Sequence, residues 1–384
     1  MHRSYRYRLY PNRQQSEALG RVLEIHRQLY NAALQERQGA WRKCRVSINF
    51  YDQSGQLKTI RAEDEDVAWL NYSSIQRTLR RLDKAFQSFF RRVKAGQKPG
   101  YPRFKSRRRW KSVVYTFRDG AAFSNGRLRI QNVGKIKVKW HRPIPAKAKI
   151  KTTILKRMGN KWYAIFQLEL PDLEPLGHEG PAVGIDLGLK TFAALSTGEC
   201  IGAPKYFCNA QKKLRRQQRR VSRRKWNSNH RRRAVRQVAK THEHIANQRR
   251  DFHHKLSRRL VNEFSFIAIE DLNIEGLGKS MLSKSIHDAG WSAFLQMLGY
   301  KAAGAGSQIV SVNPRYTSQA CSRCGCIVKK DLSTRVHDCP HCGLVLNRDH
   351  NAAINILNRA LNKAGLALQT PTWPVGACVV CEAA

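Results

Sequence analysis

The stretch Val183-Gly184-Ile185-Asp186-Leu187-Gly188 decides the fold of this 384-residue chain. A short apolar run ends in Asp186, and Gly188 follows two residues later. An apolar run of this length is typical of a buried β-strand, and a glycine just after it allows the chain to turn sharply. The stretch therefore predicts a strand that presents a carboxylate at its exposed end.

Two other acidic residues occupy similar places in the sequence. Glu270 ends the apolar run 266–269, and Asp349 opens a predicted helix at 349–354. A single acid at the end of a strand is usually a turn or cap residue. Three such carboxylates can instead share divalent cations, because Mg²⁺ and Mn²⁺ prefer oxygen ligands. In a very basic chain, Asp186, Glu270 and Asp349 together predict the metal site of a nuclease.

The charge of the chain points to nucleic acid as its partner. The sequence has 71 Lys and Arg against 27 Asp and Glu, a formal net charge of +44. Self-repulsion at this density opposes a compact fold unless a polyanion neutralises it. A membrane surface also attracts cations, but no apolar run approaches the roughly 18 residues of a membrane span, and the N-terminus does not resemble a secretory signal. Most of the cysteines are scattered, which fits the reducing cytoplasm.

The first half of the chain predicts helices and a small β-unit. Residues 3–10 alternate like a strand, and residues 14–37 have an apolar helical face. A loop containing Gly39, Ser54 and Gly55 is expected next, followed by a second amphipathic helix around 75–92 and a basic connector at 96–109. Short alternating runs then predict a small antiparallel barrel, with strands at 112–117, 127–130, 135–140, 152–155 and 162–166.

The second half predicts a mixed α/β region. Pro171 to Pro181 has the composition of a linker, and a hairpin at 191–195 should extend the strand that ends at Asp186. Residues 211–260 predict two very basic helices, broken near 226–229. A strand at 264–269, a helix at 288–303 and a strand at 308–312 complete the prediction, which makes the chain a multidomain α/β and β protein.

Four cysteines have the spacing of a zinc site. They form two Cys-x-x-Cys pairs, and Gly325 and Gly343 follow the pairs directly; the predicted ligands are Cys321, Cys324, Cys339 and Cys342. Four thiolates close a tetrahedron around one Zn²⁺ and leave no position for water, so the site should be structural. Possible substitute ligands lie close by at Cys326, His337 and His341. Cys378 and Cys381 have no partner pair.

Several basic residues are candidates for nucleic-acid contact. A helix that is positive nearly all round is unstable alone, because like charges four residues apart repel, and phosphate groups would relieve that repulsion. The alternative interpretation is a basic face exposed to solvent. The candidates are Arg77, Arg80, Arg81, Arg103, Lys105, Arg215, Arg216, Arg219, Arg220, Arg231, Arg232 and Arg236.

Six motifs in this order resemble the transposon-encoded TnpB family, whose members are related to type V CRISPR effectors. They are Arg8-Leu9-Tyr10-Pro11, Pro99-Gly100-Tyr101-Pro102-Arg103-Phe104-Lys105, Gly184-Ile185-Asp186-Leu187-Gly188, Ile269-Glu270-Asp271-Leu272, Asn313-Pro314-Arg315-Tyr316-Thr317-Ser318-Gln319 and Arg348-Asp349-His350-Asn351-Ala352-Ala353. The resemblance covers nearly the whole chain. It departs from the family at Asn347, where relatives often have an acid, and this difference concerns only the surroundings of Asp349.

The resemblance implies a domain order. The nuclease domain has a ribonuclease H-like (RuvC) fold, and the zinc ribbon is inserted between its last two acids. The expected order is the first strand of a wedge β-barrel at 1–12, a helical recognition lobe at 13–105, the rest of the wedge barrel at 106–178, the nuclease domain at 179–312, the zinc ribbon at 313–346, the last nuclease helix at 347–364 and a flexible tail at 365–384. The lobe that should read the target-adjacent motif contains Tyr30, Ser73, Gln76 and Arg80.

The resemblance also implies an activity: RNA-guided cleavage of DNA for an insertion sequence, in the cytoplasm of a bacterium or archaeon. A guide RNA from the transposon end would pair with double-stranded target DNA beside a short motif that the protein reads. Asp186, Glu270 and Asp349 would hold Mg²⁺ or Mn²⁺ for two-metal hydrolysis. One alternative is a guided DNA-binding repressor, although such proteins typically lose one of the three acids. Another is a transposase or transposase accessory protein. No recognisable pattern encodes the guide, the motif, the cleavage pattern or the oligomeric state.

Overall fold

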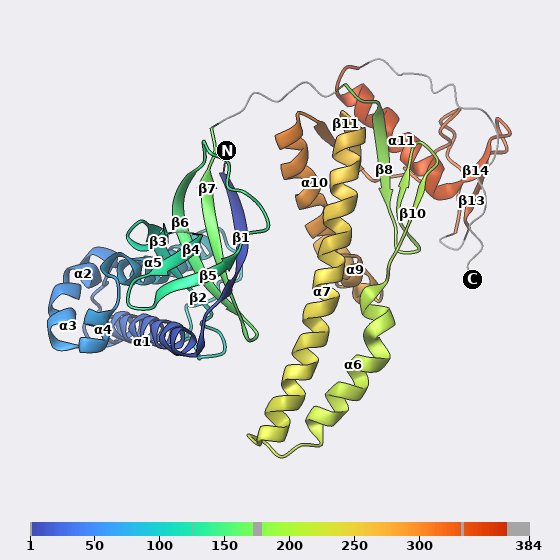
Figure 1. Cartoon of the computed structure of the whole chain (residues 1–384). Coiled ribbons are helices and arrows are strands. Elements are labelled where there is room, and N and C mark those ends of the chain that lie inside the picture. The colour runs from blue at the N-terminus through green and yellow to red at the C-terminus, as the bar shows by residue number, and fades with distance from the viewer. Residues whose placement is uncertain (1, 125, 172–178, 332–333, 367–384) are drawn as a thin grey trace. The chain divides into compact units, whose positions relative to one another are not determined.

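The computed structural model describes residues 2–124, 126–171, 179–331 and 334–366 (Figure 1). The chain divides into two compact units, Met1–Asp172 and Leu173–Ala384. Most of the predicted linker 171–181 and of the predicted tail 365–384, with Cys378 and Cys381, lies outside the described residues.

The first unit contains a closed seven-stranded barrel in the order β1-β5-β4-β3-β2-β6-β7. β1 pairs antiparallel with both β5 and β7 and thereby closes it. The strands are β1 (His2–Tyr10), β2 (Ser112–Phe117), β3 (Gly120–Ser124), β4 (Arg127–Ile130), β5 (Gly134–Lys139), β6 (Lys149–Met158) and β7 (Lys161–Glu169). The predicted barrel is therefore confirmed. β3 was not predicted, and the expectation of purely antiparallel pairing was wrong, because β2 and β3 pair in parallel.

Five helices pack against the barrel in one shared core. They are α1 (Arg13–Cys44), α2 (Phe50–Gly55), α3 (Leu57–Glu63), α4 (Glu65–Trp69) and α5 (Tyr72–Lys94). The expected loop around Gly39, Ser54 and Gly55 was wrong. α1 continues through Gly39, where a side chain would meet open space, and Asn49 starts α2 with a capping box. Reciprocal hydrogen bonds of this kind stabilise even a short helix.

A buried polar cluster joins α1 to α5. The two ring nitrogens of His26 lie 2.9 Å from Thr78 Oγ1 and 3.2 Å from Ser74 Oγ. Burial lowers the pKa of His26 to about 3, so the ring is neutral at physiological pH. The two hydroxyls satisfy its hydrogen-bonding groups, and a buried polar side chain with such partners is stable in the core.

The second unit is built on a five-stranded sheet in the order β10-β9-β8-β11-β12. β8 (Ala182–Leu187), β11 (Phe266–Glu270) and β12 (Gln308–Val312) are parallel, whereas β9 (Thr191–Leu195) and β10 (Cys200–Gly202) continue the sheet antiparallel. Alternate residues of β11 face two different cores. Ile267 and Ile269 pack in the core with α7 and α10, and Phe266 and Ala268 pack in the core with α11.

The helices of this unit agree with most of the prediction. α6 (Tyr206–Ser222) and α7 (Asn229–Glu263) form the expected basic pair, and α10 (Trp291–Ala305) and α11 (Arg348–Lys363) cover the sheet. α8 (Ile274–Leu277) and α9 (Ser283–Ala289) precede α10. The predicted helix 288–303 is in fact divided, because Gly290 has a φ of 67° and separates α9 from α10.

A two-stranded sheet of β13 (Val336–Asp338) and β14 (Val345–Asn347) completes the unit (Figure 1). Among the helices that the structure describes, none is both long and apolar enough to cross a membrane.

Candidate functional site

Asp186 and Glu270 lie at the same edge of the second sheet. β8 and β11 run parallel in a register that pairs Ile185 with Ile269, and each acid is the next residue along its strand. Equivalent positions on neighbouring parallel strands reach the same edge of a sheet. The two predicted acids are therefore neighbours in the structure.

The helix α11, which has Asp349 in its first turn, lies unusually close to β8. A Cβ atom added to Gly184 would lie 2.0 Å from the carbonyl oxygen of Ala353 and 2.8 Å from the backbone nitrogen of Leu357. Only glycine permits backbones to approach so closely. The helix is started by Asn347, whose side chain accepts a hydrogen bond from the backbone N–H of Asp349. Asp349 thus lies in the first turn of α11, one helical turn before Ala353.

The three carboxylates interact electrostatically. Burial, and then the charges of Glu270 and Asp349, raise the pKa of Asp186 to about 8. Burial also raises the pKa of Glu270, although a hydrogen bond from Thr317 and the charge of Arg359 oppose that effect. Carboxylates gathered in a partly buried place disfavour each other's ionisation. A divalent cation would relieve this repulsion, and the all-oxygen donor set fits Mg²⁺ or Mn²⁺.

The ligand atoms of the three acids lie farther apart than the sulfurs of the four predicted zinc cysteines. Within the described part of the chain, the four thiols are the one group of metal-ligand side chains close enough together to hold an ion as it stands. Two arginines also border Asp349, with Arg335 Nη1 3.8 Å and Arg348 Nε 3.9 Å from its Oδ1. Their positive charges partly balance the acids.

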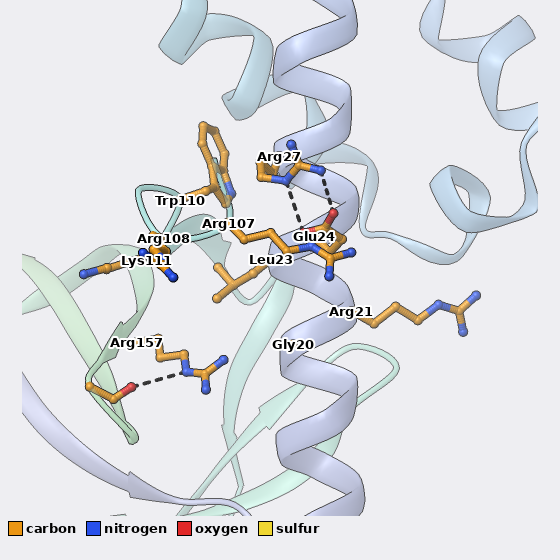
Figure 2. Close-up of a pocket in the computed structure, with 11 residues that line it drawn as sticks. Gly20, Arg21, Leu23, Glu24, Arg27, Arg107, Arg108, Trp110, Lys111 and Arg157 are labelled. Atoms are coloured by element: carbon orange, nitrogen blue, oxygen red, sulfur yellow. Dashed lines mark hydrogen bonds and ion pairs between the residues drawn. The ribbon is translucent and has the colours of Figure 1, made fainter. Parts of the chain in front are cut away.

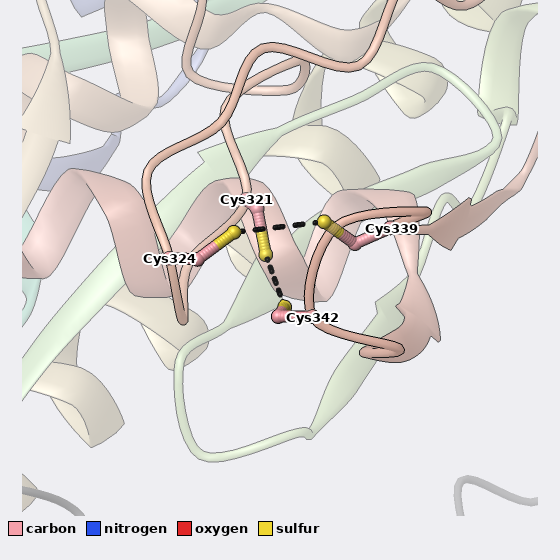
Figure 3. Close-up of side chains that lie close together, drawn as sticks. All are labelled: Cys321, Cys324, Cys339 and Cys342. Atoms are coloured by element: carbon pink, nitrogen blue, oxygen red, sulfur yellow. Dashed lines mark hydrogen bonds between the residues drawn. The ribbon is translucent and has the colours of Figure 1, made fainter.

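The predicted cysteines come together in one cluster (Figure 3). Cys321 Sγ lies 3.5 Å from Cys342 Sγ, Cys324 Sγ lies 3.6 Å from Cys339 Sγ, and the four sulfurs are all within 4.8 Å of one another. Gly325 and Gly343 have φ values of 78° and 68°, which the turn after each pair requires. Burial opposes ionisation of Cys339, but the backbone N–H groups of Cys342 and His341 lower its pKa to about 6.

This cluster fits a structural Zn²⁺, because four thiolates satisfy its tetrahedral preference. The substitute ligands considered from the sequence are not part of it. His337 is fully buried, and its Nδ1 contacts the amino group of Lys330. Cys326 and His341 are absent from the group of four.

Polar side chains of α11 fasten the zinc ribbon to the sheet edge. Asn351 Oδ1 accepts a hydrogen bond of 2.9 Å from the backbone N–H of Ser322, between the first two cysteines. Asn355 Nδ2 donates to the carbonyl oxygens of Thr317 and Ala320 at 2.9 and 2.7 Å. One face of α11, whose first turn contains Asp349, therefore holds the segment that leads into the ribbon.

The predicted basic residues of the helix pair α6–α7 are mostly exposed. Two of them have contacts within the pair: Arg231 Nη1 donates to the carbonyl oxygen of Val221 at 2.9 Å, and Arg232 contacts Asn229. Arg231 thereby satisfies a carbonyl in the last turn of α6, which is a structural role. The exposed members are Arg215, Arg216, Arg219, Arg220, Arg232 and Arg236.

In the first unit, most of the predicted basic residues touch the protein itself. Arg77 donates to Thr116 Oγ1 at 3.1 and 3.0 Å. The guanidinium groups of Arg80 and Arg81 lie over the rings of Phe50 and Trp110. The remaining two differ in exposure: Arg103 is exposed, and Lys105 is half-buried with its amino group over Tyr30.

The first unit also has a basic cavity of about 530 Å³ that sequence analysis did not identify (Figure 2). Glu24 orients two of its arginines, with Arg27 Nη2 at 2.6 Å and Arg107 Nε at 3.0 Å from its carboxylate. Further basic residues on its lining are Arg21, Arg108, Lys111 and Arg157. They come from α1, the connector and the β6–β7 hairpin, and no local pattern links segments so far apart in the sequence.

Three family models match separate parts of the chain. A model described as a probable transposase matches residues 165–281, and one described as a Cas12f1-like TNB domain matches residues 291–356. A model described as a helix-turn-helix domain matches residues 1–45. In this structure that segment contains β1 and the single helix α1, so it has no helix-turn-helix.

Two relatives match almost the full chain. A Streptomyces pristinaespiralis protein, provisionally named an RNA-guided DNA endonuclease, is 36% identical over 94% of this chain and 89% of its own length. The Escherichia coli K12 protein InsQ, provisionally named in the same way, is 30% identical over 92% of this chain and 91% of its own length.

A solved structure has a similar fold. The protein in a cryo-EM complex of Cas12f1 with sgRNA and target DNA is 15% identical to this chain. The match covers 90% of this chain and 83% of that one, with a TM-score of 0.58.

Proposed function

Because the chain belongs to the TnpB family of transposon-encoded RNA-guided DNA endonucleases, we propose that it cleaves double-stranded DNA selected by a bound guide RNA. The observation that carries the proposal is the position of Asp186, partly buried beside Glu270 and interacting with Asp349. A carboxylate whose pKa is raised by burial and by two neighbouring carboxylates is typical of a site that binds cations.

In the proposed reaction, Asp186, Glu270 and Asp349 would together hold two divalent cations. Cations held there would supply a water of lowered pKa and stabilise charge on the leaving oxygen. The protein's own contribution is to fix the three carboxylates on two strands and one helix. The zinc ribbon keeps a separate, structural role, because its four thiolates leave no open position.

The domain assignments follow from the same proposal. The five-stranded sheet with α11 would be the ribonuclease H-like (RuvC) domain, the closed barrel the wedge domain, and α1–α5 the recognition lobe. The exposed arginines of α6 and α7 and the basic cavity of the first unit would bind phosphates of the guide RNA and the target. In guided systems of this kind base pairing reads the sequence, and the protein reads the short motif beside it.

Cleavage by the purified complex tests the proposal. The protein with its copurified RNA should cut a matching duplex in Mg²⁺, and Asp186→Ala should abolish cutting while guided binding persists. Asp251→Ala is the matched control, because Asp251 is 63% exposed and its ion pair is with Lys255 on the same helix. Cutting by Asp186→Ala would refute the assigned site. Guided binding without cleavage by the wild type would instead identify a repressor, and guide-independent insertion would identify a transposase.

A further inference from the structure

The hydroxyl of Thr317 contacts one oxygen of Glu270. Thr317 Oγ1 lies 2.5 Å from Glu270 Oε1 and 3.0 Å from the carbonyl oxygen of Pro314. The hydroxyl has one hydrogen, so it can donate to only one of these acceptors. The shorter distance and the negative charge of an ionised carboxylate favour Glu270. Thr317 is only 4% exposed, so water does not compete readily for this hydrogen bond.

The backbone of Thr317 is itself held by α11. Its carbonyl oxygen accepts from Asn355 Nδ2, and Asn351 Nδ2 donates to the carbonyl oxygen of Ala320 at 2.7 Å. Arg359 Nη1 donates to the carbonyl oxygen of Arg315 at 2.7 Å. These three side chains are spaced four residues apart and so share one face of the helix.

The same segment continues into the zinc ribbon. Cys321 directly follows Ala320, and Asn351 binds the backbone of Ser322 inside the first cysteine pair. α11, whose first turn contains Asp349, therefore holds both the first zinc-binding turn and the threonine that touches Glu270. The two kinds of metal site are joined through a few hydrogen bonds.

We propose that Thr317 is a positioning residue for Glu270 and that it couples the zinc ribbon to the nuclease centre. The inference rests on the proposed function, in which Glu270 holds a divalent cation. The terminal torsion of a glutamate is broad, so a free carboxylate samples many orientations. The Thr317 hydroxyl restrains Oε1 and leaves Oε2 available to a cation. Mg²⁺ demands near-ideal ligand geometry, and a carboxylate restrained in this way meets that demand.

Two pairs of variants isolate the hydroxyl. Thr317→Val keeps the size of the side chain and removes its hydroxyl. Thr317→Ser and Thr317→Ala both lack the methyl group and differ from each other only in the hydroxyl. Thr78→Val is the control, because it removes an equally buried hydroxyl that contacts His26 in the first unit.

The main measurement is the Mn²⁺ affinity of the RNA-bound protein by calorimetry. Only the binding signal that disappears in Asp186→Ala is assigned to the nuclease site. Thr317→Val and Thr317→Ala should bind Mn²⁺ about 10- to 100-fold more weakly, as expected for the loss of a group that orients a metal ligand. Thr317→Ser and Thr78→Val should bind it like the wild type. The Mg²⁺ concentration that half-activates cleavage should rise by the same factor in the two weak binders.

The coupling to the ribbon has its own test. Cys342→Ser, which opens the cysteine cluster, should weaken Mn²⁺ binding in the wild type and add little in Thr317→Val, because interacting positions are not additive.

An unchanged Mn²⁺ affinity in Thr317→Val would refute the positioning role of Thr317. Equal losses of Mn²⁺ affinity in Thr317→Ser and Thr317→Ala would show that Thr317 acts through packing of its methyl group and not through its hydroxyl. A wild-type complex that binds Mn²⁺ but cuts no DNA would overturn the nuclease function instead. In that case the affinities alone decide the role of Thr317.

Discussion

Replacing Gly184 by alanine should inactivate the protein without removing any charged or polar group. The new Cβ would lie 2.0 Å from the carbonyl oxygen of Ala353, and real Cβ atoms essentially never approach another heavy atom within 3.0 Å. Both neighbours, Ala353 and Leu357, present backbone atoms that cannot rotate away. α11 must therefore move off β8 by roughly 1 Å.

The first turn of the same helix contains Asp349, so this displacement reaches the proposed metal site. A misplacement of about 1 Å typically costs on the order of 100-fold in rate. Overpacking of this kind also costs about 1–3 kcal/mol of folding stability. We expect Gly184→Ala to cut DNA about 100-fold more slowly, to unfold at a lower temperature, and to retain its zinc.

Cleavage rates at saturating Mg²⁺, thermal unfolding and zinc content would be measured side by side. Gly202→Ala is the control, because Gly202 lies in β10 of the same sheet and a Cβ there meets nothing within 4 Å. Wild-type cleavage by Gly184→Ala would show that the close approach of α11 to β8 does not set the position of Asp349.

Three further predictions follow from the charges and the cysteines. Without added Mg²⁺, the free energy of unfolding should fall as the pH rises from about 4 to about 8. Over this range Asp186 ionises in the unfolded chain but stays protonated in the folded protein, because its folded pKa is about 8. Asp186→Asn should weaken this pH dependence, measured by thermal unfolding. Cys339→Ser should abolish stoichiometric zinc binding, and hydrogen exchange should show the loss of β13–β14 while the barrel stays protected. Arg219→Gln should lower the salt dependence of nucleic-acid binding by about 0.9 log units of affinity per log unit of salt, with the melting temperature unchanged. Arg231→Gln should instead lower the melting temperature, because Arg231 hydrogen-bonds a carbonyl at the end of α6.

Local sequence patterns predicted the parts of the site that depend on single elements. Asp186 and Glu270 were recognisable because each ends a short apolar run, and the cysteines because of their spacing. Gly39 was misinterpreted because a helix tolerates a glycine where no contact is needed. The capping box of Asn49 and Asp52 is a local signal that marks the start of α2.

Long-range contacts were beyond the reach of such patterns. The cavity around Glu24 brings together three distant segments, and the hydrogen bond of Thr317 to Glu270 depends on how α11 lies against the sheet. The two-metal geometry and the domain boundaries stay predictions. The sequence could predict only which residue types stand at the ends of helices and strands, because periodicity and capping determine those.

Barrel closure by β1 has a consequence for how the chain matures on the ribosome. His2 is synthesised long before its partner Glu169, which stands at the end of β7, beyond the whole helical segment and strands β2–β6. Before β5 emerges the β1 segment has no barrel partner, and before β7 emerges one of its two edges stays unpaired; unpaired strand edges promote aggregation. Deleting the first ten residues would leave β5 and β7 permanently open, so the yield of dispersed protein should depend strongly on this short leading segment.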